Sequence, residues 1–401
     1  MRAASPEFAD WLRMADVVAI DDPDQLSHYR LAWNALWHGT PRASFFHTYD
    51  WFATQWKHFA GKGRDYRALV VRAAGDVVGI VPLCVRTEPH RLGSIRVLTY
   101  PLDNWGAWYG PIGPNQAATM WVAAHWIAAA QRDWDLLELR WIDAAPTDRA
   151  ASVAALRAAG LPARLSPYDA TSVIELPDTW DDYLASRDTK RRHEFRRQLR
   201  LAKREGNVEF VRHRPQSAAC GDGDPRWDLF EQCRQVAAAS WQGDSTSGNT
   251  LTHPAVRDFL ADAHEAAARL GMVDVCLLRL NGRPAAFAYN YHAGGYVSGL
   301  RTGFDQSISN RGLGRTLLLH VVRDSIRRGD RSIDLGVGER TYKRHFRTSL
   351  QHSSRVVHYP PLALRSQGIR LARWLKSQWG AEPAKGDEKK TGDASPAVST
   401  S

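Results

Sequence analysis

The chain has 401 residues, of which 44% are hydrophobic and 10% aromatic, the composition of a folded protein. At about 150 residues per domain, this length predicts two or three domains. The sequence contains no uncharged apolar run of about 18 residues, so we expect no membrane-spanning helix. Its first residues carry acids within their apolar stretch and do not resemble a signal peptide.

The charge is unbalanced, since 53 Lys and Arg against 43 Asp and Glu give a net charge of +10. This excess favours anionic partners such as nucleotides, nucleic acid or an acidic membrane surface. Four cysteines, at 84, 220, 233 and 276, are too far apart for a metal cluster or a disulfide framework. We therefore expect a reducing, cytoplasmic compartment and no metal site.

One pattern of strands and helices occurs twice. Residues 67–83 and 274–290 each read as an apolar strand, an Arg, a short turn containing Gly and a second apolar strand, which predicts two β-hairpins. Further strand residues, a helix with apolar spacing near 3.6 and a buried strand follow each hairpin. The helices are predicted at 117–133 and 314–330, and the buried strands at 134–142 and 331–338. The shared order favours an internal duplication.

The second unit is predicted to begin with a strand at 172–176 and a helix capped at Asp178 or Thr179. A second helix is expected from Thr189 to Glu205, with apolar residues on one face and Arg and Lys over the rest. Its basic face is either a solvated helix surface or a positive wall beside a site for an anionic substrate.

Residues 309–324, SNRGLGRTLLLHVVRD, place two glycines at the start of an apolar helix. A helix N-terminus presents unpaired N–H groups and a partial positive charge, and glycines let the backbone approach a pyrophosphate. Arg311 and Arg315 add charged donors. The stretch is therefore a phosphate loop or, alternatively, a flexible turn. It lacks the third glycine of a Rossmann loop and the G-K-[ST] of a Walker A loop.

Residues 311–316, RGLGRT, resemble the acyl-CoA pyrophosphate loop of the GNAT acyltransferases, [Q/R]-x-x-G-x-[G/A], with Thr316 at the small position. The wider chain, from about Phe45 to Phe346, is similar to the CelD-type acyltransferases of bacteria. The motifs that carry this similarity are HTYDWFATQWKHF, GIVPL, KRRHEFRRQLRLAKREG, GRPAAFAYNYH, GFD, RGLGRTLL and DLGVGERTYKRHF. That subgroup resembles the FemABX aminoacyltransferases in carrying tandem GNAT units.

The resemblance implies an α/β (α+β) fold of tandem GNAT-like units, each a mixed, mostly antiparallel sheet flanked by helices. Usually one unit keeps a cofactor loop, and here the aromatic stretch 103–113, DNWGAWYGPIG, takes its place in the first unit. We interpret that stretch as structural or substrate-facing. The expected divisions are a degenerate unit at 1–165, a catalytic acyl-CoA-binding unit at 166–360, a basic amphipathic helix at 361–380 and a disordered tail at 381–401.

The resemblance also implies N-acyl transfer with acyl-CoA as the donor substrate. No set of His, Cys and Asp has the spacing of a metal site or a nucleophilic triad, so we expect direct attack in a ternary complex and no metal. The acceptor would be an amine of an envelope polysaccharide, an amino acid or a lipid such as a sphingoid precursor. Two alternatives remain open. The first is aminoacyl transfer from aminoacyl-tRNA, in which the basic helix contacts RNA. The second is a non-catalytic component of polysaccharide biosynthesis.

Acylation of an amine needs a base, a group that stabilises the oxyanion and an acid for the departing thiolate. Asp305 is the candidate base, although it also fits a turn. The resemblance places a Tyr-Lys pair at the active centre, so Lys343 would stabilise the oxyanion and Tyr342 would protonate the thiolate. Alternatively, Lys343 is one basic residue among many in RTYKRHFR.

Binding residues are predicted for both substrates. Those for the donor are Asn310, Arg311, Gly312, Leu313, Gly314, Arg315 and Thr316. Those for the acceptor are Trp241, Tyr289, Arg301 and Asp334.

Residues 365–379 combine Ile, Leu and Trp with Arg and Lys at helical spacing. This pattern is typical of a helix that lies on an anionic membrane surface. The alternative is a last helix that packs on the core. The first interpretation would place a cytoplasmic protein peripherally on the inner membrane.

Overall fold

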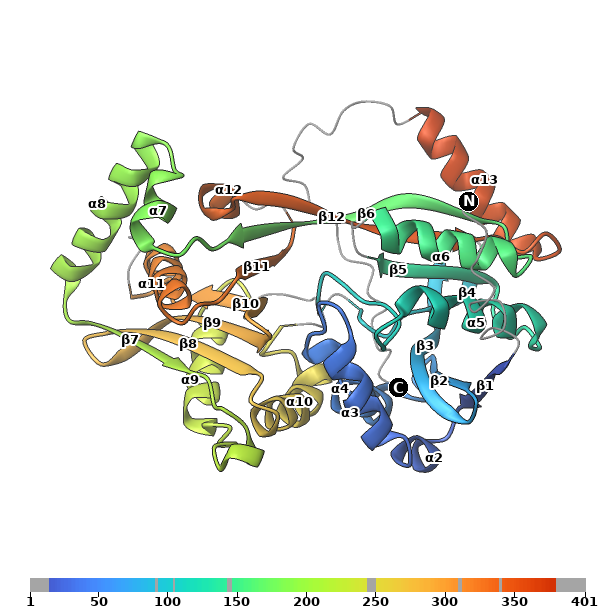
Figure 1. Ribbon diagram of the computed structural model, residues 1–401. Coiled ribbons are helices and arrows are strands. Elements are labelled where there is room, and N and C mark those ends of the chain that lie inside the picture. Colours follow the sequence, from blue (N-terminus) through green and yellow to red (C-terminus); the bar gives the residue numbers. More distant parts are fainter. Residues whose placement is uncertain are drawn as a thin grey trace.

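A computed structural model describes residues 14–90, 93–103, 105–142, 146–243, 250–308, 312–338 and 341–379. The strands of this part form one sheet in the order β1-β2-β3-β4-β5-β12-β6-β11-β10-β9-β8-β7 (Figure 1). Their bounds are β1 Ala15–Ile20, β2 Arg64–Ala73, β3 Asp76–His90, β4 Gly93–Thr99, β5 Leu136–Ile142, β6 Ala163–Glu175, β7 Val208–His213, β8 Val273–Leu280, β9 Arg283–Ala293, β10 Tyr296–Phe304, β11 Ser332–Val337 and β12 Ser349–His358.

Helices pack on this sheet and around its ends (Figure 1). Their bounds are α2 Pro23–Ser27, α3 Arg30–Gly39, α4 Tyr49–Phe59, α5 Gln116–Ala129, α6 Pro146–Ala158, α7 Trp180–Ala185, α8 Thr189–Glu205, α9 Trp227–Ala238, α10 Arg257–Arg269, α11 Leu313–Arg327, α12 Thr341–Phe346 and α13 Leu364–Trp379. The helix predicted at 189–205 coincides with α8, whose N-terminus is capped by Asp188. The helix predicted at 117–133 ends earlier, at Ala129, because Ala130 is extended.

The predicted duplication is present in the sheet. Strands β2, β3 and β4 form an antiparallel meander, α5 follows, and β5 pairs in parallel with β4. Strands β8, β9 and β10, then α11 and β11, repeat this arrangement. We call β2, β3, β4, α5 and β5 the first repeat, and β8, β9, β10, α11 and β11 the second repeat. The predicted fold class, tandem units with a mixed, mostly antiparallel sheet, is confirmed.

The two halves exchange their last strands. Long strands β6 and β12 pair antiparallel from Val173 with Ser349 to Ala163 with His358. Strand β6 also pairs with β11, and β12 also pairs with β5, so each half of the chain completes the other half's sheet. The predicted division between residues 165 and 166 lies inside β6, and the limits of the predicted units stay a prediction.

Both repeats contain an opening between parallel strands. Strand β4 pairs with β5 only at Val97 and Leu98, and β10 pairs with β11 only from Tyr296 to Ser298. Beyond these residues the strands separate toward their C-terminal ends. The separation leaves backbone N–H and C=O groups of both strands without a partner on the facing strand, and such groups need another partner.

Aromatic residues join the two halves in one core. Trp51 of α4 lies 5.3 Å from Phe259 of α10, measured between ring centroids, and Phe45 lies 4.4 Å from Tyr291 of β9. Trp51 and Phe45 are completely buried. Because rings from both halves share this core, burial of their apolar area stabilises the halves together.

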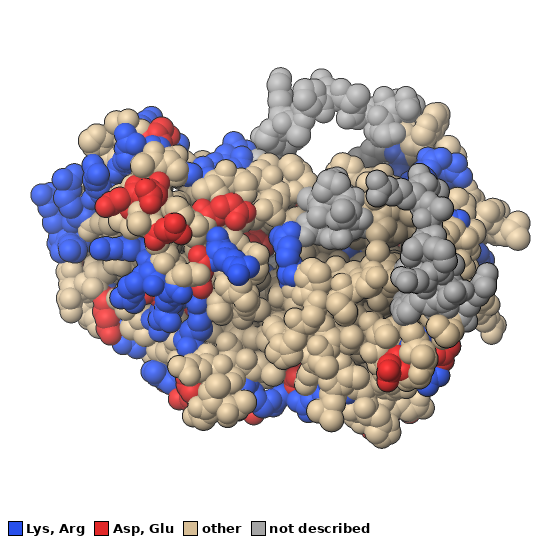
Figure 2. Space-filling view, viewed as in Figure 1, with Lys and Arg blue, Asp and Glu red and all other residues tan. Residues whose placement is uncertain are grey.

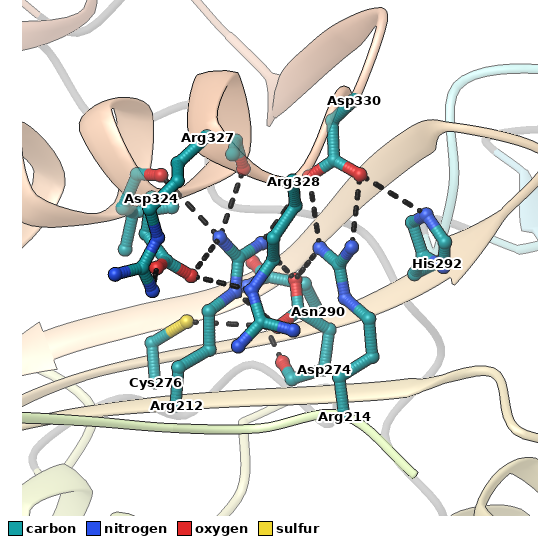
Figure 3. Close-up of polar contacts among 12 residues, drawn as sticks. Arg212, Arg214, Asp274, Cys276, Asn290, His292, Asp324, Arg327, Arg328 and Asp330 are labelled. Carbon is teal, nitrogen blue, oxygen red and sulfur yellow. Dashed lines mark hydrogen bonds and ion pairs between the residues drawn. The ribbon is translucent and has the colours of Figure 1, made fainter. Parts of the chain in front are cut away.

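A buried ion cluster lies beneath the C-terminal half of α11 (Figure 3). Arg212 donates to Asp274 at 2.8 Å and to Asp324 at 3.1 Å, and Arg214 donates to Asp330 at 2.8 Å. The imidazole of His292 lies 3.2 Å from Asp330. Burial alone would raise the pKa of Asp274, but the charges and hydrogen bonds of Arg212 and Arg214 lower it to about 2. The cluster ties β7, β8, β9 and α11 together.

Helix α13 packs on the sheet by one face. Ile369 is buried among residues of β4 and β5, and Arg373 forms an ion pair with buried Glu138 at 2.8 Å. Of the two alternatives that the sequence left open for this helix, packing on the core therefore applies to the face that contains Ile369 and Arg373. Leu371 and Trp374 remain 56% and 53% exposed. Among the described residues, no helix is both long and apolar enough to cross a membrane.

Candidate active site

The opening between β10 and β11 lies beside the start of α11. Gly312 is the N-cap of this helix and adopts the left-handed conformation, with φ of 81°. A Cβ at this position would lie 2.9 Å from the side-chain amide of Gln198, so glycine suits both the conformation and the space. Gly312 has no side chain to cap the helix, and no other described residue caps it, so the described residues leave its first N–H groups available to an anion.

Helix α8 lies along this helix start. Gln198 donates to the carbonyl of Gly312 and to the hydroxyl of Thr316, each at 3.2 Å. Arg315 pairs with Glu194 of α8 at 2.7 Å and keeps 43% of its side chain exposed. Thr316 itself is buried. Helix α8 thus positions the first turn of α11.

The remaining predicted donor residues have different surroundings. Leu313 is buried in the core of the second repeat. A Cβ on Gly314 would lie 3.2 Å from the ring of Phe304, which explains a small residue there. Asn310 and Arg311 lie outside the described residues.

Asp334 and Lys343 meet where β11 leaves β10. Asp334 accepts hydrogen bonds from the hydroxyl of Thr171 and from the backbone N–H of Gly336. Burial raises the pKa of the Asp334 carboxyl, while these hydrogen bonds and the charge of Lys343 oppose the rise. A raised pKa suits a group that must gain and lose a proton near neutral pH.

Lys343 extends from α12 into the opening. Its side chain is buried, and Nζ donates to the carbonyls of Gly336 at 2.7 Å and Val337 at 2.8 Å. These carbonyls belong to the part of β11 that no longer pairs with β10. The ammonium group therefore supplies the partner that the separated strand needs, and it brings a positive charge close to Asp334. Tyr342, the preceding residue, is half-buried.

Residues from the first half of the chain also lie near the opening between β10 and β11. Arg301 of β10 stacks its guanidinium over the ring of Trp105 at 4.7 Å. Arg42 lies over the ring of Trp108 at 5.5 Å, and its charge also lowers the pKa of Asp334. The aromatic stretch 103–113 thus contacts residues of the second repeat.

Arg42 also lines a cavity in the first repeat. The cavity is bounded by the end of β4, the start of α5, part of α6 and the aromatic stretch, and its wall includes His47, Tyr100, Trp108, Tyr109, Gln116 and Met120. His47 is buried, which lowers its pKa to about 4, and its ring stacks on Tyr109. Arg42 therefore lines this cavity and also acts electrostatically on Asp334.

Asp305 directly follows β10 and is buried, but its contacts are those of a turn residue. Its Oδ1 accepts from the backbone N–H of Ser307 at 2.8 Å and from the hydroxyl of Ser307 at 2.6 Å. Asp334, rather than Asp305, is the carboxylate that the structure brings next to Lys343. The catalytic role predicted for Asp305 stays a prediction.

The other predicted acceptor residues divide into two groups. Trp241 and its neighbour Gln242, which was not among the predicted residues, both donate to the carbonyl of Thr302 on β10 at 3.3 Å, so this loop lies against the strand that borders the opening. Tyr289 is fully buried, and its hydroxyl lies 3.0 Å from His264 in the core. Tyr289 is therefore a core residue whose hydroxyl is held by His264, and its predicted role in acceptor binding stays a prediction.

Residues that the sequence did not single out complete the site. They are Arg42, Trp105, Trp108, Thr171, Glu194 and Gln198. Gln198 could have been noticed as the neutral residue between Arg197 and Leu199 in a basic helix. The others carry no local signal, because the sheet brings them together from distant parts of the chain. Among the described residues, no cluster of His, Cys, Asp and Glu is arranged to hold a metal ion.

Comparison with known proteins agrees with this geometry. Residues 189–344 match the family model of the acetyltransferase (GNAT) domain. This range begins at α8 and includes the second repeat and the first residues of α12. The resemblance of the chain to the GNAT superfamily is therefore confirmed, and the matched segment includes the start of α11, Asp334 and Lys343. No curated protein matches the sequence.

Solved structures extend the likeness to the whole fold. FemX superposes with a TM-score of 0.54 at 11% identity, over 89% of this chain and 99% of its own. The C-terminal domain of a protein described as a lysylphosphatidylglycerol synthetase from Agrobacterium fabrum gives 0.52 at 13% identity, over 87% and 97%. A conserved protein of unknown function from Bacteroides thetaiotaomicron gives 0.50 at 13% identity, over 86% and 100%. At these identities the likeness establishes the fold alone.

Proposed function

We propose that the protein transfers an acyl group from the thioester of acyl-CoA to an amine. The observation that carries the proposal is the uncapped start of α11 behind left-handed Gly312, at the opening that holds Asp334 and Lys343. The acetyltransferase domain match over the same residues supports it. The donor pyrophosphate would bind the first N–H groups of α11, with Arg311 and Arg315 as charged donors.

The reaction would proceed in one complex, without an acyl-enzyme. The neutral amine attacks the thioester carbonyl carbon and forms a C–N bond, and the carbon–sulfur bond then breaks. Asp334, with its raised pKa, accepts the proton from the attacking nitrogen. Lys343 stabilises the oxyanion, and Tyr342 supplies a proton to the departing thiolate. Asp305 is retained as an alternative base.

The cavity of the first repeat is the proposed acceptor site. Its aromatic wall suits an apolar or ring-shaped part of the acceptor, and Arg42 suits an anionic group on it. An amino acid, a sugar precursor or a lipid amine would meet this description. An Arg42→Ala variant should raise the KM for the acceptor about 10-fold and leave the donor KM unchanged. A rise in the donor KM instead would contradict this assignment.

A second function has a specific observation in its favour. FemX shares the fold, and α8 presents a basic face beside the donor loop. Transfer of an aminoacyl group from aminoacyl-tRNA therefore remains the competing proposal. A non-catalytic role in polysaccharide biosynthesis predicts that Asp334 and Lys343 are dispensable.

Ligand-dependent melting separates these functions. Acetyl-CoA, palmitoyl-CoA and an aminoacyl-tRNA would each be added to the purified full chain, since a ligand of the folded state raises the melting temperature. We expect a rise with a CoA ester that an Arg311→Glu variant loses. A panel of amines, followed by mass spectrometry of the products, then identifies the acceptor. If no CoA ester raises the melting temperature and Arg311→Glu keeps full function, the proposal is wrong.

The exposed face of α13 is a proposed membrane contact. Leu364 precedes Leu371 and Trp374 on this face and is 88% exposed, and Arg370 lies beside them. Leu362, two residues before the helix, is 91% exposed. Apolar side chains next to cations suit an anionic lipid surface. The protein should sediment with vesicles of phosphatidylglycerol and not with phosphatidylcholine vesicles, and a Trp374→Ser/Leu371→Ser variant should lose this binding. Equal sedimentation of that variant would argue against the contact.

A further inference from the structure

Six exposed cations form one strip on the outer face of α8. They are Lys190, Arg196, Arg197, Arg200, Lys203 and Arg204. Their helical spacing places all of them on the side opposite buried Phe195 and Ala202. Figure 2 shows Lys and Arg gathered over this helix at the left edge of the molecule. We call these six residues the α8 strip.

The strip is electrostatically unbalanced. Among the described residues, none of the six forms an ion pair. Helix α8 has two acids, Glu194, which is already shared by Arg191 and Arg315, and Glu205 at its last position. Like charges at neighbouring helix positions repel one another, so the strip destabilises its own helix when nothing is bound. A bound anionic partner would relieve this repulsion.

The strip lies at the donor end of the candidate site. On its inner side, α8 holds the start of α11 through Gln198. Phe195 of α8 also stacks on Phe346 of α12 at 4.8 Å, three residues after Lys343. A partner along the outer face of α8 would therefore stand beside both the donor helix and the helix that carries Lys343.

The strip is longer than a single nucleotide needs. From Lys190 to Arg204 it spans about 21 Å at a rise of 1.5 Å per residue. The phosphates of one CoA molecule would occupy the start of α11 and, at most, one end of the strip, because screened charges act over about 8–10 Å. The remaining cations suit a partner with many negative charges along a comparable length.

We propose that an acidic carrier protein, bearing the acyl group as a thioester on a phosphopantetheine arm, docks on the α8 strip. This inference rests on the proposed thioester function. The arm has the same thiol end as CoA, and its phosphodiester would take the place of the pyrophosphate at the start of α11. Acidic side chains of the carrier protein would pair with the strip, and the thioester would reach Asp334 and Lys343 through the opening.

The observations favour a carrier protein over RNA and over a membrane. The strip lies inside the segment that matches an acetyltransferase domain, and acetyl donors are thioesters. Beside it, α8 exposes a single ring, the imidazole of His193, and no Phe, Tyr or Trp, whereas recognition of single-stranded RNA commonly stacks several bases on such rings. It also has no exposed large apolar side chain to enter a bilayer, in contrast to α13.

Charge reversal on the strip tests the proposal with the full chain. Binding of acetyl-CoA and of an acidic fatty-acid carrier protein bearing acetyl-phosphopantetheine would be measured by calorimetry for the natural protein and for an Arg196→Glu/Arg200→Glu/Lys203→Glu variant. A Lys62→Glu/Arg164→Glu/Arg257→Glu variant carries the same change in net charge at exposed positions on other parts of the molecule. Melting curves check that all three proteins fold.

We expect the strip variant to bind the carrier protein on the order of 10- to 100-fold more weakly, and acetyl-CoA within about threefold of the natural protein. The control variant should bind both as the natural protein does. Binding of the natural protein to the carrier should also weaken with salt.

Other outcomes overturn the proposal in distinguishable ways. Binding of acetyl-CoA but not of the carrier protein removes this inference and leaves the proposed function intact, whereas binding of neither removes both. Equal loss of both donors in the strip variant would assign the strip to the nucleotide. Displacement of the carrier protein by tRNA, with tRNA binding lost in the strip variant and carrier binding unchanged, would assign it to RNA.

Discussion

Helices α5 and α11 begin at equivalent points of the two repeats, and among the described residues a side chain caps α5 but not α11. The side chain of Asn115 accepts the N–H of Ala118 at 3.0 Å at the start of α5. Helix α11 begins at Gly312, which has no side chain to do so. One helix start is therefore satisfied by the chain itself, and the other remains open to an anion.

The openings beside these two helices are filled by different kinds of side chain. In the first repeat, the aromatic stretch enters the opening, and the backbone N–H of Tyr109 donates to the carbonyl of Trp141 at 2.9 Å. In the second repeat, a charged side chain, Lys343, meets the separated strand. The same framework thus gives an aromatic cavity in one repeat and a polar, charged opening in the other. This contrast is why we assign the acceptor to the first repeat and the donor to the second.

The repeats also differ beneath the end of the helix. The second repeat buries the cluster around Asp274, whereas the first has Asp133 paired with Arg67, and 35% of the Asp133 side chain is exposed. Breaking a buried pair leaves an uncompensated charge, while an exposed pair contributes little. Asp274→Asn should therefore lower the free energy of unfolding by about 3–5 kcal/mol, and Asp133→Asn by about 1 kcal/mol or less.

Urea unfolding at pH 7 measures both changes. Equal losses in the two variants would mean that the two repeats are stabilised alike at this end. A small loss in Asp274→Asn alone would mean that the remaining acids of the cluster, Asp324 and Asp330, compensate Arg212 and Arg214.

Lys343 provides the sharpest test of the catalytic repeat. If it stabilises the oxyanion, Lys343→Met should lower kcat on the order of 100- to 1000-fold with every acceptor. Arg344→Met changes an exposed cation on the same helix and should stay within about threefold of the natural protein. Steady-state kinetics with the acceptor found by the amine screen measure both. A rise in KM with kcat unchanged would instead make Lys343 a binding residue.

Two buried histidines give the repeats a similar response to acid. Burial lowers the pKa of both His47, in the cavity of the first repeat, and His264, in the core of the second half, to about 4. An unfolded histidine titrates near 6.5, so between these values the unfolded chain binds protons that the folded chain does not. Stability is therefore fully present above about pH 6.5 and is lost as the pH falls toward 4.

A His47→Gln variant should reduce the loss of stability between pH 7 and pH 5 by about 1–2 kcal/mol, and His264→Gln should do the same. Urea unfolding at the two pH values measures these differences. An unchanged pH dependence in His47→Gln would mean that water reaches this histidine through the cavity, so that the ring is not held neutral.

Local patterns predicted the elements of the fold, because hairpins, caps and helix spacing are encoded within short stretches. The basic helix 189–205, the paired hairpins and the order of the repeats all followed from such signals. The strand exchange between β6 and β12 did not, since it depends on pairing between Ala163–Glu175 and Ser349–His358. No local sequence pattern predicts whether β6 or β12 pairs with the strands of the first half of the chain or with those of the second half.

The candidate site was predicted only where a motif is continuous. Gly312 and Lys343 lie in recognisable stretches, but Arg42 and Thr171 reach the site across long sequence separations. Asp334 was predicted to bind substrate, and its raised pKa depends on burial that the sequence does not report. Tyr289 was predicted from a strand whose alternation indicates two faces but not which face is the core.

The smallest expected effect bears most directly on which repeat binds the donor. Gly312 has φ of 81°, and Gly113, two residues before the N-cap of α5, has φ of 137°. Alanine is strained at both positions by about 1 kcal/mol or more.

The two glycines differ in what an added Cβ would meet. At Gly312 it meets the flexible amide end of the Gln198 side chain, whereas at Gly113 it meets the backbone carbonyl of Val78 at 2.9 Å. Gly113→Ala should therefore lower the melting temperature more. Only Gly312→Ala should weaken acetyl-CoA binding, by about fivefold, because the first backbone N–H groups of α11 would shift away from the pyrophosphate. Calorimetry with acetyl-CoA measures this difference, and weaker binding in Gly113→Ala alone would reverse the roles assigned to the two repeats.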